Sequence, residues 1–310
     1  MKDINKYRGI FPAFYACYGS DGEIDAGAVK ALTEYLAEQG VKGLYVGGSS
    51  GECIYQGVAE RKLLLEKVIE AAKGRLTIIA HVACNNTRDS MELARHAEAV
   101  GVDAIASIPP IYFRLPEHAI AKYWNDISSA APNTDFVIYN IPQLAGVALT
   151  IPLLKEMLKN PRVIGVKNSS MPVQDIQMFK DEGTRGGREF VVFNGPDEQL
   201  ISGLMMGADG GIGGTYGVMP ELFTALYKLF NEKRLDEARA LQYDIDNIIY
   251  TLCTAKCNLY ASMKEVMKRR VGLDLGGVRP PLAEYREVDN EVVEKAKALI
   301  EDAVKKYKNL

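Results

Sequence analysis

The feature that most constrains the fold is an alternation of short apolar segments with helical patterns, repeated along most of the chain. The apolar segments span residues 9–16, 42–48, 76–83, 102–110, 135–142, 163–170, 189–195 and 208–217. Each is followed by a segment whose apolar residues recur at helical spacing, as Val29, Leu32 and Leu36 do before Gly40. Strands this uniformly apolar are typical of a parallel sheet that is covered on both faces.

Eight strand–helix units predict an α/β fold of the (β/α)8 TIM-barrel type. The alternative is a doubly wound open sheet. It is disfavoured because the first strand leads into FPAFYACYGS rather than a glycine-rich dinucleotide-binding turn. Beyond residue 232 the pattern is helical only, over residues 235–253, 260–270 and 289–308. We therefore expect a catalytic barrel over residues 1–232 and a C-terminal three-helix extension over 233–310, packed on the barrel.

Composition and charge exclude several classes of partner. The 310 residues are 47% hydrophobic and 25% charged, and the formal net charge is −3. This balance predicts a globular protein with no nucleic-acid or membrane-surface partner. No apolar run approaches the roughly 20 residues that span a bilayer. The first residues lack the apolar core of a secretory signal, so we expect a cytoplasmic protein.

The five cysteines are scattered and odd in number, which argues against disulfides. Cys253 and Cys257 lie four residues apart in a helical pattern. Two thiols packed on one helix face explain this spacing better than a zinc site, because no second pair of ligands accompanies them.

Chemistry is expected where barrel strands end, and one strand there carries a lysine. Val163, Ile164 and Val166 form an apolar strand that leads into Lys167, although lysine is rarely buried. A poorly solvated ammonium has a lowered pKa, and the free amine can attack a ketone to form an imine. The protonated imine then accepts the electrons of a breaking carbon–carbon bond. A lysine paired with an acidic neighbour for structural reasons is the alternative.

Other candidates lie at the ends of neighbouring strands. Tyr139 occupies the equivalent position one strand earlier and could relay protons near Lys167. The sequence GGSSGE at 47–52 could hold a carboxylate with its backbone and hydroxyls, although an ordinary loop that runs into the next helix through Glu52 is the simpler interpretation. His81 has no ligand partners at metal-binding spacing, so a buried, hydrogen-bonded histidine is favoured.

Several motifs together resemble the class I pyruvate-dependent aldolase family, which includes dihydrodipicolinate synthase and N-acetylneuraminate lyase. They are GLYVGGSSGE, VIYNIPQLAG, VIGVKNSS and NGPDEQLISGLMMGADGGIGGTYG, and the resemblance extends over nearly the whole chain. It implies that Lys167 forms a Schiff base with a 2-keto acid and that Tyr139 transfers protons. It further implies that Ser49 and Ser50 bind the keto-acid carboxylate, with Ser50 in the proton relay, and that no metal or organic cofactor is needed.

The resemblance also implies an oligomer. Tyr112, in PPIYFRLPEH, matches a tyrosine that family members lend to the active site of a neighbouring subunit. We therefore expect a homotetramer arranged as a dimer of dimers, which acts on a small keto or sugar acid.

The choice of second substrate depends on a few positions. Leu144 stands where the synthases have a carboxylate-binding arginine, so synthase activity is disfavoured. The sequence NGPDE supplies Gly195, Asp197 and Glu198, which match residues that bind the hydroxyl-rich tail of sialic acid. These features favour reversible cleavage of N-acetylneuraminate to N-acetylmannosamine and pyruvate.

Two substrate-binding positions depart from the common family pattern. Gly214 replaces a frequent serine, and Ser169 replaces a frequent threonine while keeping the hydroxyl. The alternatives left open are another 2-keto-3-deoxy sugar acid aldolase, a 4-hydroxy-tetrahydrodipicolinate synthase, and a non-catalytic keto-acid sensor.

Overall fold

The computed structural model describes residues 4–308, which form two compact units that interleave along the sequence. The first, here called the strand unit, contains the described residues up to Phe11, then Lys42–Val46 and Thr77–Gly213. The second, here called the helical unit, contains Pro12–Val41, Gly47–Leu76 and the described residues from Gly214 onward. The expected domain boundary after residue 232 stays a prediction.

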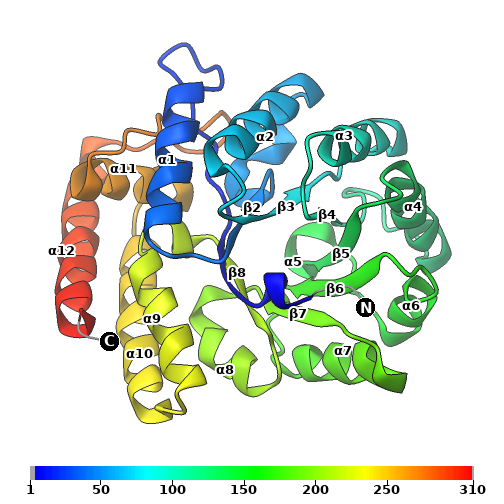
Figure 1. Cartoon of the computed structure of the whole chain (residues 1–310). Coiled ribbons are helices and arrows are strands. Elements are labelled where there is room, and N and C mark those ends of the chain that lie inside the picture. Colours follow the sequence, from blue (N-terminus) through cyan, green and yellow to red (C-terminus); the bar gives the residue numbers. More distant parts are fainter. Residues whose placement is uncertain (1–3, 309–310) are drawn as a thin grey trace. The chain divides into compact units, whose positions relative to one another are not determined.

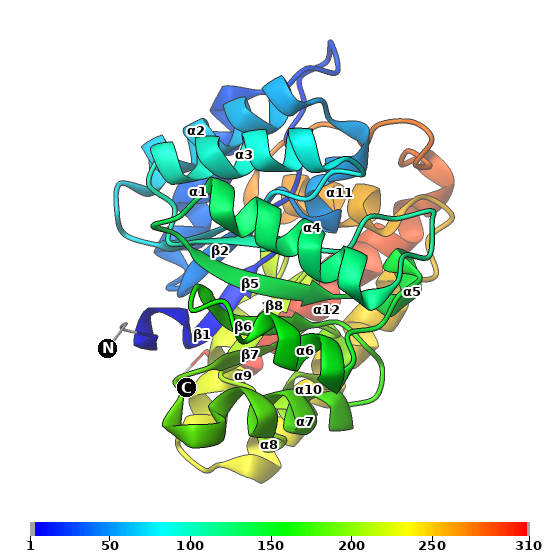
Figure 2. The same cartoon turned by 90° about the vertical axis from the view of Figure 1, so that its right-hand side faces the viewer.

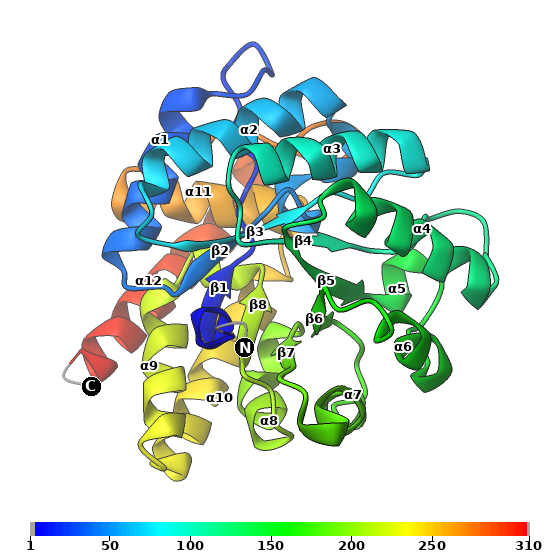
Figure 3. The same cartoon turned by 45° about the vertical axis from the view of Figure 1, so that its right-hand side comes forward.

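One sheet runs through the strand unit. Its strands are β1 (Gly9–Pro12), β2 (Gly43–Val46), β3 (Thr77–His81), β4 (Ala104–Ser107), β5 (Asp135–Asn140), β6 (Val163–Asn168), β7 (Val191–Asn194) and β8 (Gly210–Gly213). Their order is β1-β8-β7-β6-β5-β4-β3-β2, which can be followed in Figure 3, and the pairs from β2 to β8 are parallel. The N–H of Lys42, just before β2, donates to the carbonyl of Ile10 in β1 at 2.9 Å. The sheet is thus a nearly closed barrel, as predicted, and the doubly wound alternative is wrong.

Apolar side chains from the strands fill the interior of this sheet. The cluster includes Phe11, Tyr45, Ile79, Val137, Tyr139, Val191, Phe193 and Ile212, each at most 3% exposed. Gly43 is required for this packing, because a β-carbon there would lie 2.3 Å from the ring of Phe11 and 2.1 Å from the carbonyl of Thr77. A layered interior of large side chains is what closes a small barrel into a solid core.

Helices follow the strands in chain order. Those of the strand unit are α3 (Thr87–Ala99), α4 (Glu117–Ala130), α5 (Pro142–Ala145), α6 (Ile151–Met157), α7 (Gln174–Thr184) and α8 (Leu200–Met205). In this unit α3 packs beside α4, and α6 beside α7 (Figure 2). Capping explains where α3 begins, since the side-chain oxygen of Asn86 accepts the N–H of Asp89 at 2.8 Å. The sequence pattern did not predict the short helix α5.

The helical unit contains the remaining helices. They are α1 (Ala26–Glu38), α2 (Val58–Ala72), α9 (Pro220–Asn231), α10 (Leu235–Leu252), α11 (Leu259–Val271) and α12 (Asn290–Tyr307). Helix α1 lies along α2, and α10 lies along both α9 and α12 (Figure 1). The three helices predicted after residue 232 are confirmed as α10, α11 and α12. No helix among residues 4–308 has the length and apolar character needed to cross a membrane.

None of the five cysteines, all of which lie within residues 4–308, is in a disulfide. The expectation that Cys253 and Cys257 share one helix face is wrong, because α10 ends at Leu252. Cys253 caps that helix and is exposed, whereas Cys257 is buried in the loop that follows.

Candidate active site

Lys167 and Tyr139 are direct register partners on adjacent strands. Partners on neighbouring parallel strands point to the same face of a sheet, so both side chains reach the barrel interior. The Lys167 side chain is buried, and its Nζ lies 4.0 Å from the centre of the Tyr139 ring. The predicted convergence of these two residues is therefore confirmed. The two strands end at Asn140 and Asn168, one residue after Tyr139 and Lys167 and two residues before the predicted bounds.

A second tyrosine, which sequence reasoning missed, completes the surroundings of the amine. The ring centre of Tyr45, on β2, lies 4.4 Å from Nζ of Lys167. The rings of Tyr45 and Tyr139 meet edge to face at 5.7 Å, and the His81 ring lies about 6 Å from each. The sequence pointed to Tyr45 only through its spacing. It lies two residues from both Gly43 and Gly47, and alternate residues point to the same face of a strand, here the inner face.

These aromatic groups act on the amine in two opposing ways. Burial penalises the ammonium form, whereas the faces of the two tyrosine rings attract a cation. His81 is buried, as expected for a histidine inside the barrel. The surroundings of Lys167 are therefore buried and aromatic, an environment in which an amine can become a nucleophile.

Three buried asparagines continue the same strands one residue further. Asn140, Asn168 and Asn194 are register partners at the ends of β5, β6 and β7. The Asn140 amide donates to Oδ1 of Asn168 at 2.7 Å, and its own oxygen accepts the N–H of Leu149 at 2.8 Å. Asn168 also donates to the hydroxyl of Ser170. This network fixes the strand ends next to Tyr139 and Lys167, and nothing in the sequence pattern pointed to it.

The residues after β6 and β7 approach one another closely. The N–H of Gly195 donates to the carbonyl of Asn168 at 2.8 Å. A β-carbon at Gly195 would lie only 2.1 Å from the Ser169 hydroxyl and 2.6 Å from that carbonyl. Glycine is therefore required at 195, and Ser169 and Gly195 are neighbours. Asp197 is buried and Glu198 half-buried in the 3-10 turn Asp197–Gln199 that follows.

Tyr112 lies in the loop between β4 and α4 rather than in the barrel interior. Its side chain is 90% exposed and meets the ring of Phe113 edge to face at 5.0 Å. Its φ of 89° is rare for a non-glycine residue. Leu144, on α5, is also exposed.

In the helical unit, Ser49 and Ser50 form a tight 3-10 turn together with Gly51. Ser50 is buried and Ser49 half-buried. Gly214 lies beside Ser50, since a β-carbon at 214 would be 3.1 Å from the Ser50 hydroxyl. The structure thus brings together two of the predicted substrate-binding positions, and a side chain at 214 would crowd that hydroxyl.

Glu52, which follows this turn, precedes a second short 3-10 helix, Cys53–Tyr55, rather than α2. It adopts a left-handed conformation, and its buried carboxylate forms an ion pair with Lys264 of α11 at 3.0 Å. Burial lowers the pKa of Lys264, and the negative charge of Glu52 opposes that shift. The expectation that the loop runs through Glu52 straight into α2 is therefore wrong, because α2 begins only at Val58. That the loop holds a carboxylate stays a prediction. No sequence motif indicated Lys264, because its partner lies far away in the chain.

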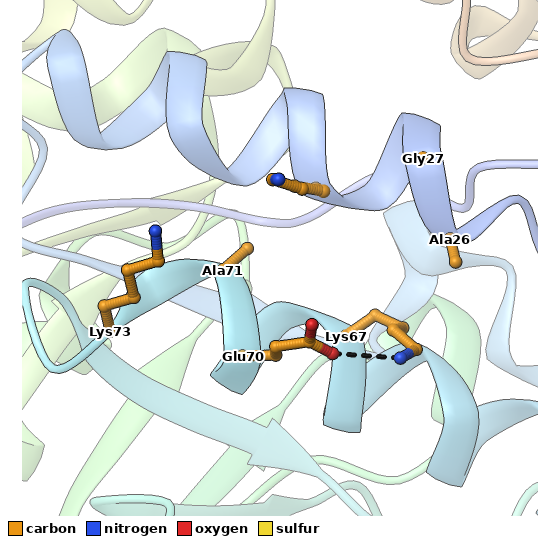
Figure 4. Close-up of a pocket in the computed structure, with 7 residues that line it drawn as sticks. Ala26, Gly27, Lys67, Glu70, Ala71 and Lys73 are labelled. Atoms are coloured by element: carbon orange, nitrogen blue, oxygen red, sulfur yellow. Dashed lines mark hydrogen bonds and ion pairs between the residues drawn. The ribbon is translucent and has the colours of Figure 1, made fainter.

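The helical unit also has a surface groove between α1 and α2, with a volume of about 400 Å³ (Figure 4). It is lined by Ala26, Gly27, Lys30, Lys67, Glu70, Ala71 and Lys73. Lys67 and Glu70 form an ion pair across one helical turn at 2.9 Å. None of the residues predicted to act on substrate lines this groove.

Comparison with known proteins identifies the family. Residues 6–302 match the Dihydrodipicolinate synthetase family. The chain belongs to this family. Among curated relatives, it is 61% identical to N-acetylneuraminate lyase of Mediterraneibacter gnavus over 307 residues, covering 99% of this chain and 96% of that protein. It is 36% identical to N-acetylneuraminate lyase of Rhizobium meliloti, covering 94% and 95% of the respective chains.

Solved structures of family members agree with this assignment. A catalytic lysine mutant of the Ruminococcus gnavus sialic acid aldolase superposes with a TM-score of 0.97 at 60% identity, covering 99% of this chain and 100% of that one. The wild-type form of that enzyme superposes with a TM-score of 0.95 at 61% identity, covering 97% and 99%. The predicted resemblance to this family is confirmed.

Proposed function

We propose that this chain is an N-acetylneuraminate lyase, a carbon–carbon lyase that cleaves sialic acid to N-acetylmannosamine and pyruvate. The observation that carries the proposal is the buried Lys167 amine, 4.0 Å from the ring centre of Tyr139 on the adjacent strand. A chain 61% identical to a curated lyase over almost its whole length supports the same substrate.

The proposed reaction starts with attack of the Lys167 amine on the keto carbon, C2, of the open-chain sugar acid. Loss of water gives a protonated imine. In that dehydration Tyr139 gives its phenolic proton to the departing hydroxide, and the resulting phenolate takes the proton of the C4 hydroxyl as the bond between C3 and C4 breaks. The bonding electrons move into the imine to give an enamine. N-acetylmannosamine leaves. Protonation of the enamine at C3 and addition of water then release pyruvate and restore the amine, so atoms and charge balance.

Binding of the substrate carboxylate is assigned to the Ser49–Ser50 turn, with Ser50 also in the proton relay. A tight turn of small residues, with one hydroxyl buried beside Gly214, suits a small planar anion. The polyhydroxyl tail is assigned to Ser169, Gly195, Asp197, Glu198 and Gly214. Carboxylates and hydroxyls suit such a tail because each can hydrogen-bond a sugar hydroxyl.

Two alternative activities would use the same amine. Another 2-keto-3-deoxy sugar acid aldolase would share the imine chemistry and differ only in the tail that it accepts. A 4-hydroxy-tetrahydrodipicolinate synthase would need a cation in place of Leu144, whose exposed side chain cannot bind a carboxylate.

Borohydride trapping tests the proposal directly. The protein is incubated separately with N-acetylneuraminate and with pyruvate, reduced, digested and analysed by mass spectrometry. We expect added mass on the peptide that contains Lys167 in both cases, and release of N-acetylmannosamine in an unreduced control. Trapping on pyruvate without sugar cleavage would retain the imine and reject the lyase assignment. A failure to trap either compound would reject both.

The active form is proposed to be a homotetramer in which Tyr112 completes the site of a neighbouring subunit. The adjacent aromatic rings of Tyr112 and Phe113, 90% and 72% exposed, support a subunit contact at this loop, because such groups are usually covered. Light scattering should give about four times the chain mass of 34.1 kDa. A monomer that is fully active would contradict the shared site.

The proposed partners are limited to the small keto or sugar acid and other copies of the chain. The proposed location is the cytoplasm, which five cysteines outside disulfides favour.

A further inference from the structure

The loop that carries Ser49 and Ser50 is held by a buried ion pair with a helix more than two hundred residues away in the sequence. We propose that Lys264, on α11, is a positioning residue for substrate binding: through Glu52 it fixes the Ser49–Ser50 turn in the conformation that receives the substrate carboxylate. This inference rests on the proposed function and assigns a role in it to the C-terminal extension.

The backbone at Glu52 needs external support. Its φ of 53° and ψ of 33° lie in the left-handed region, which is unfavourable for a residue with a β-carbon. The N–H of Glu52 donates to the carbonyl of Ser49 at 2.9 Å, and the N–H of Cys53 donates to that of Gly48 at 3.3 Å. The left-handed residue therefore closes the turn that contains both serines. If Glu52 relaxed to an ordinary conformation, those two hydrogen bonds would be lost.

The Glu52 side chain supplies that support. Its carboxylate is fully buried, with one oxygen 3.0 Å from Lys264 Nζ and the other accepting the backbone N–H of Arg279 at 2.8 Å. Lys264 is 2% exposed and also donates to the carbonyl of Gly277 at 2.6 Å. Its ammonium lies 4.9 Å from the centre of the Tyr18 ring. A buried charge with this many partners is held in one geometry, because any movement would leave it unpaired.

The same helix supports the other side of Ser50. Met263, the residue before Lys264, accepts a hydrogen bond from the Tyr15 hydroxyl at 3.4 Å. The same hydrogen is shared with the carbonyl of Gly214, the nearer acceptor at 2.7 Å. Because Gly214 borders the Ser50 hydroxyl, α11 reaches both the turn and the residue beside it. Helix α11 therefore reaches the surroundings of Ser50 through two separate side chains, Lys264 and Met263.

The test compares Lys264→Met with Arg270→Met, a matched control on the same helix. Arg270 also forms an ion pair, with Glu221, which lies outside the Ser49–Ser50 turn. We expect both variants to lose thermal stability. Lys264→Met should also raise the KM for N-acetylneuraminate, and the pyruvate concentration that half-saturates borohydride trapping, by about ten-fold or more. Arg270→Met should keep both values within about two-fold of wild type.

Two further variants cover the case in which Lys264→Met does not fold. Glu52→Gln keeps the shape and the acceptor for Arg279, and Glu52→Gln combined with Lys264→Met removes both buried charges. Each should raise KM more than it lowers kcat. If these variants keep the wild-type KM, the inference is overturned while the proposed function stands. The same conclusion follows if Arg270→Met raises KM as much as Lys264→Met does. Absence of trapping in the wild-type protein would instead overturn the proposed function and this inference with it.

Discussion

Replacement of Lys167 by alanine is expected to abolish covalent trapping of pyruvate and to lower kcat for sialic acid cleavage by at least about 10⁴-fold. The amine is the only group proposed to bond to substrate, and an alanine methyl cannot form an imine. Borohydride labelling followed by peptide mapping, together with steady-state kinetics, measures both effects.

The protein contains an internal control for this result. Lys264 is the other lysine that is buried among residues 4–308, but its ammonium is held by Glu52 and the carbonyl of Gly277. We expect no label on its peptide in the wild-type protein. Lys167→Ala should still fold, because the substitution removes a buried charge that is costly to desolvate. Residual cleavage near the wild-type rate would contradict the mechanism.

Replacement of Tyr139 by phenylalanine is expected to lower kcat by about 10²–10⁴-fold, the usual contribution of a positioned acid or base. The ring, and with it the packing around Lys167, is kept. Pyruvate should therefore still be trapped at Lys167, but more slowly, since the proton relay also assists imine formation. Steady-state kinetics and the time course of trapping separate the two steps.

Tyr45→Phe is the matched control for Tyr139→Phe. Both rings lie within 4.4 Å of the Lys167 amine, measured to the ring centre, and each variant removes only a hydroxyl. Only Tyr139 is assigned a proton-transfer role, so Tyr45→Phe should stay within about ten-fold of wild-type kcat. Equal losses in the two variants would mean that the hydroxyl of Tyr139 has no special part in the reaction.

Much of this site could be predicted because barrels restrict where side chains can lie. The eight apolar segments predicted the strands, and the rule that reactive groups lie near strand ends selected Lys167 and Tyr139. Their pairing across β5 and β6 confirms that they lie side by side, and their roles in the reaction stay predictions. The family motifs added Ser49, Ser50 and the residues of NGPDE, whose roles stay predictions.

The remaining features depend on contacts that no local pattern encodes. In the sequence, Tyr45 resembles any aromatic residue of a strand. Its contact with Lys167 arises only because β2 and β6 belong to the same barrel. In the sequence, the asparagines after Tyr139 and Lys167 are ordinary polar residues at strand ends. Only the sheet register shows that they are neighbours. Cys253 and Cys257 were expected on one helix face, but α10 ends before the first of them.

The sequence by itself determined the order of strands and helices, the barrel and the position of the lysine to which the chemistry is assigned. Periodicity and apolar runs are local properties, and a parallel barrel follows from them with little further information. Only the tertiary structure decided what surrounds that lysine and what holds the Ser49–Ser50 turn. Those arrangements come from buried side chains distant in the sequence, such as Glu52 and Lys264, whose pairing depends on how the backbone folds back on itself.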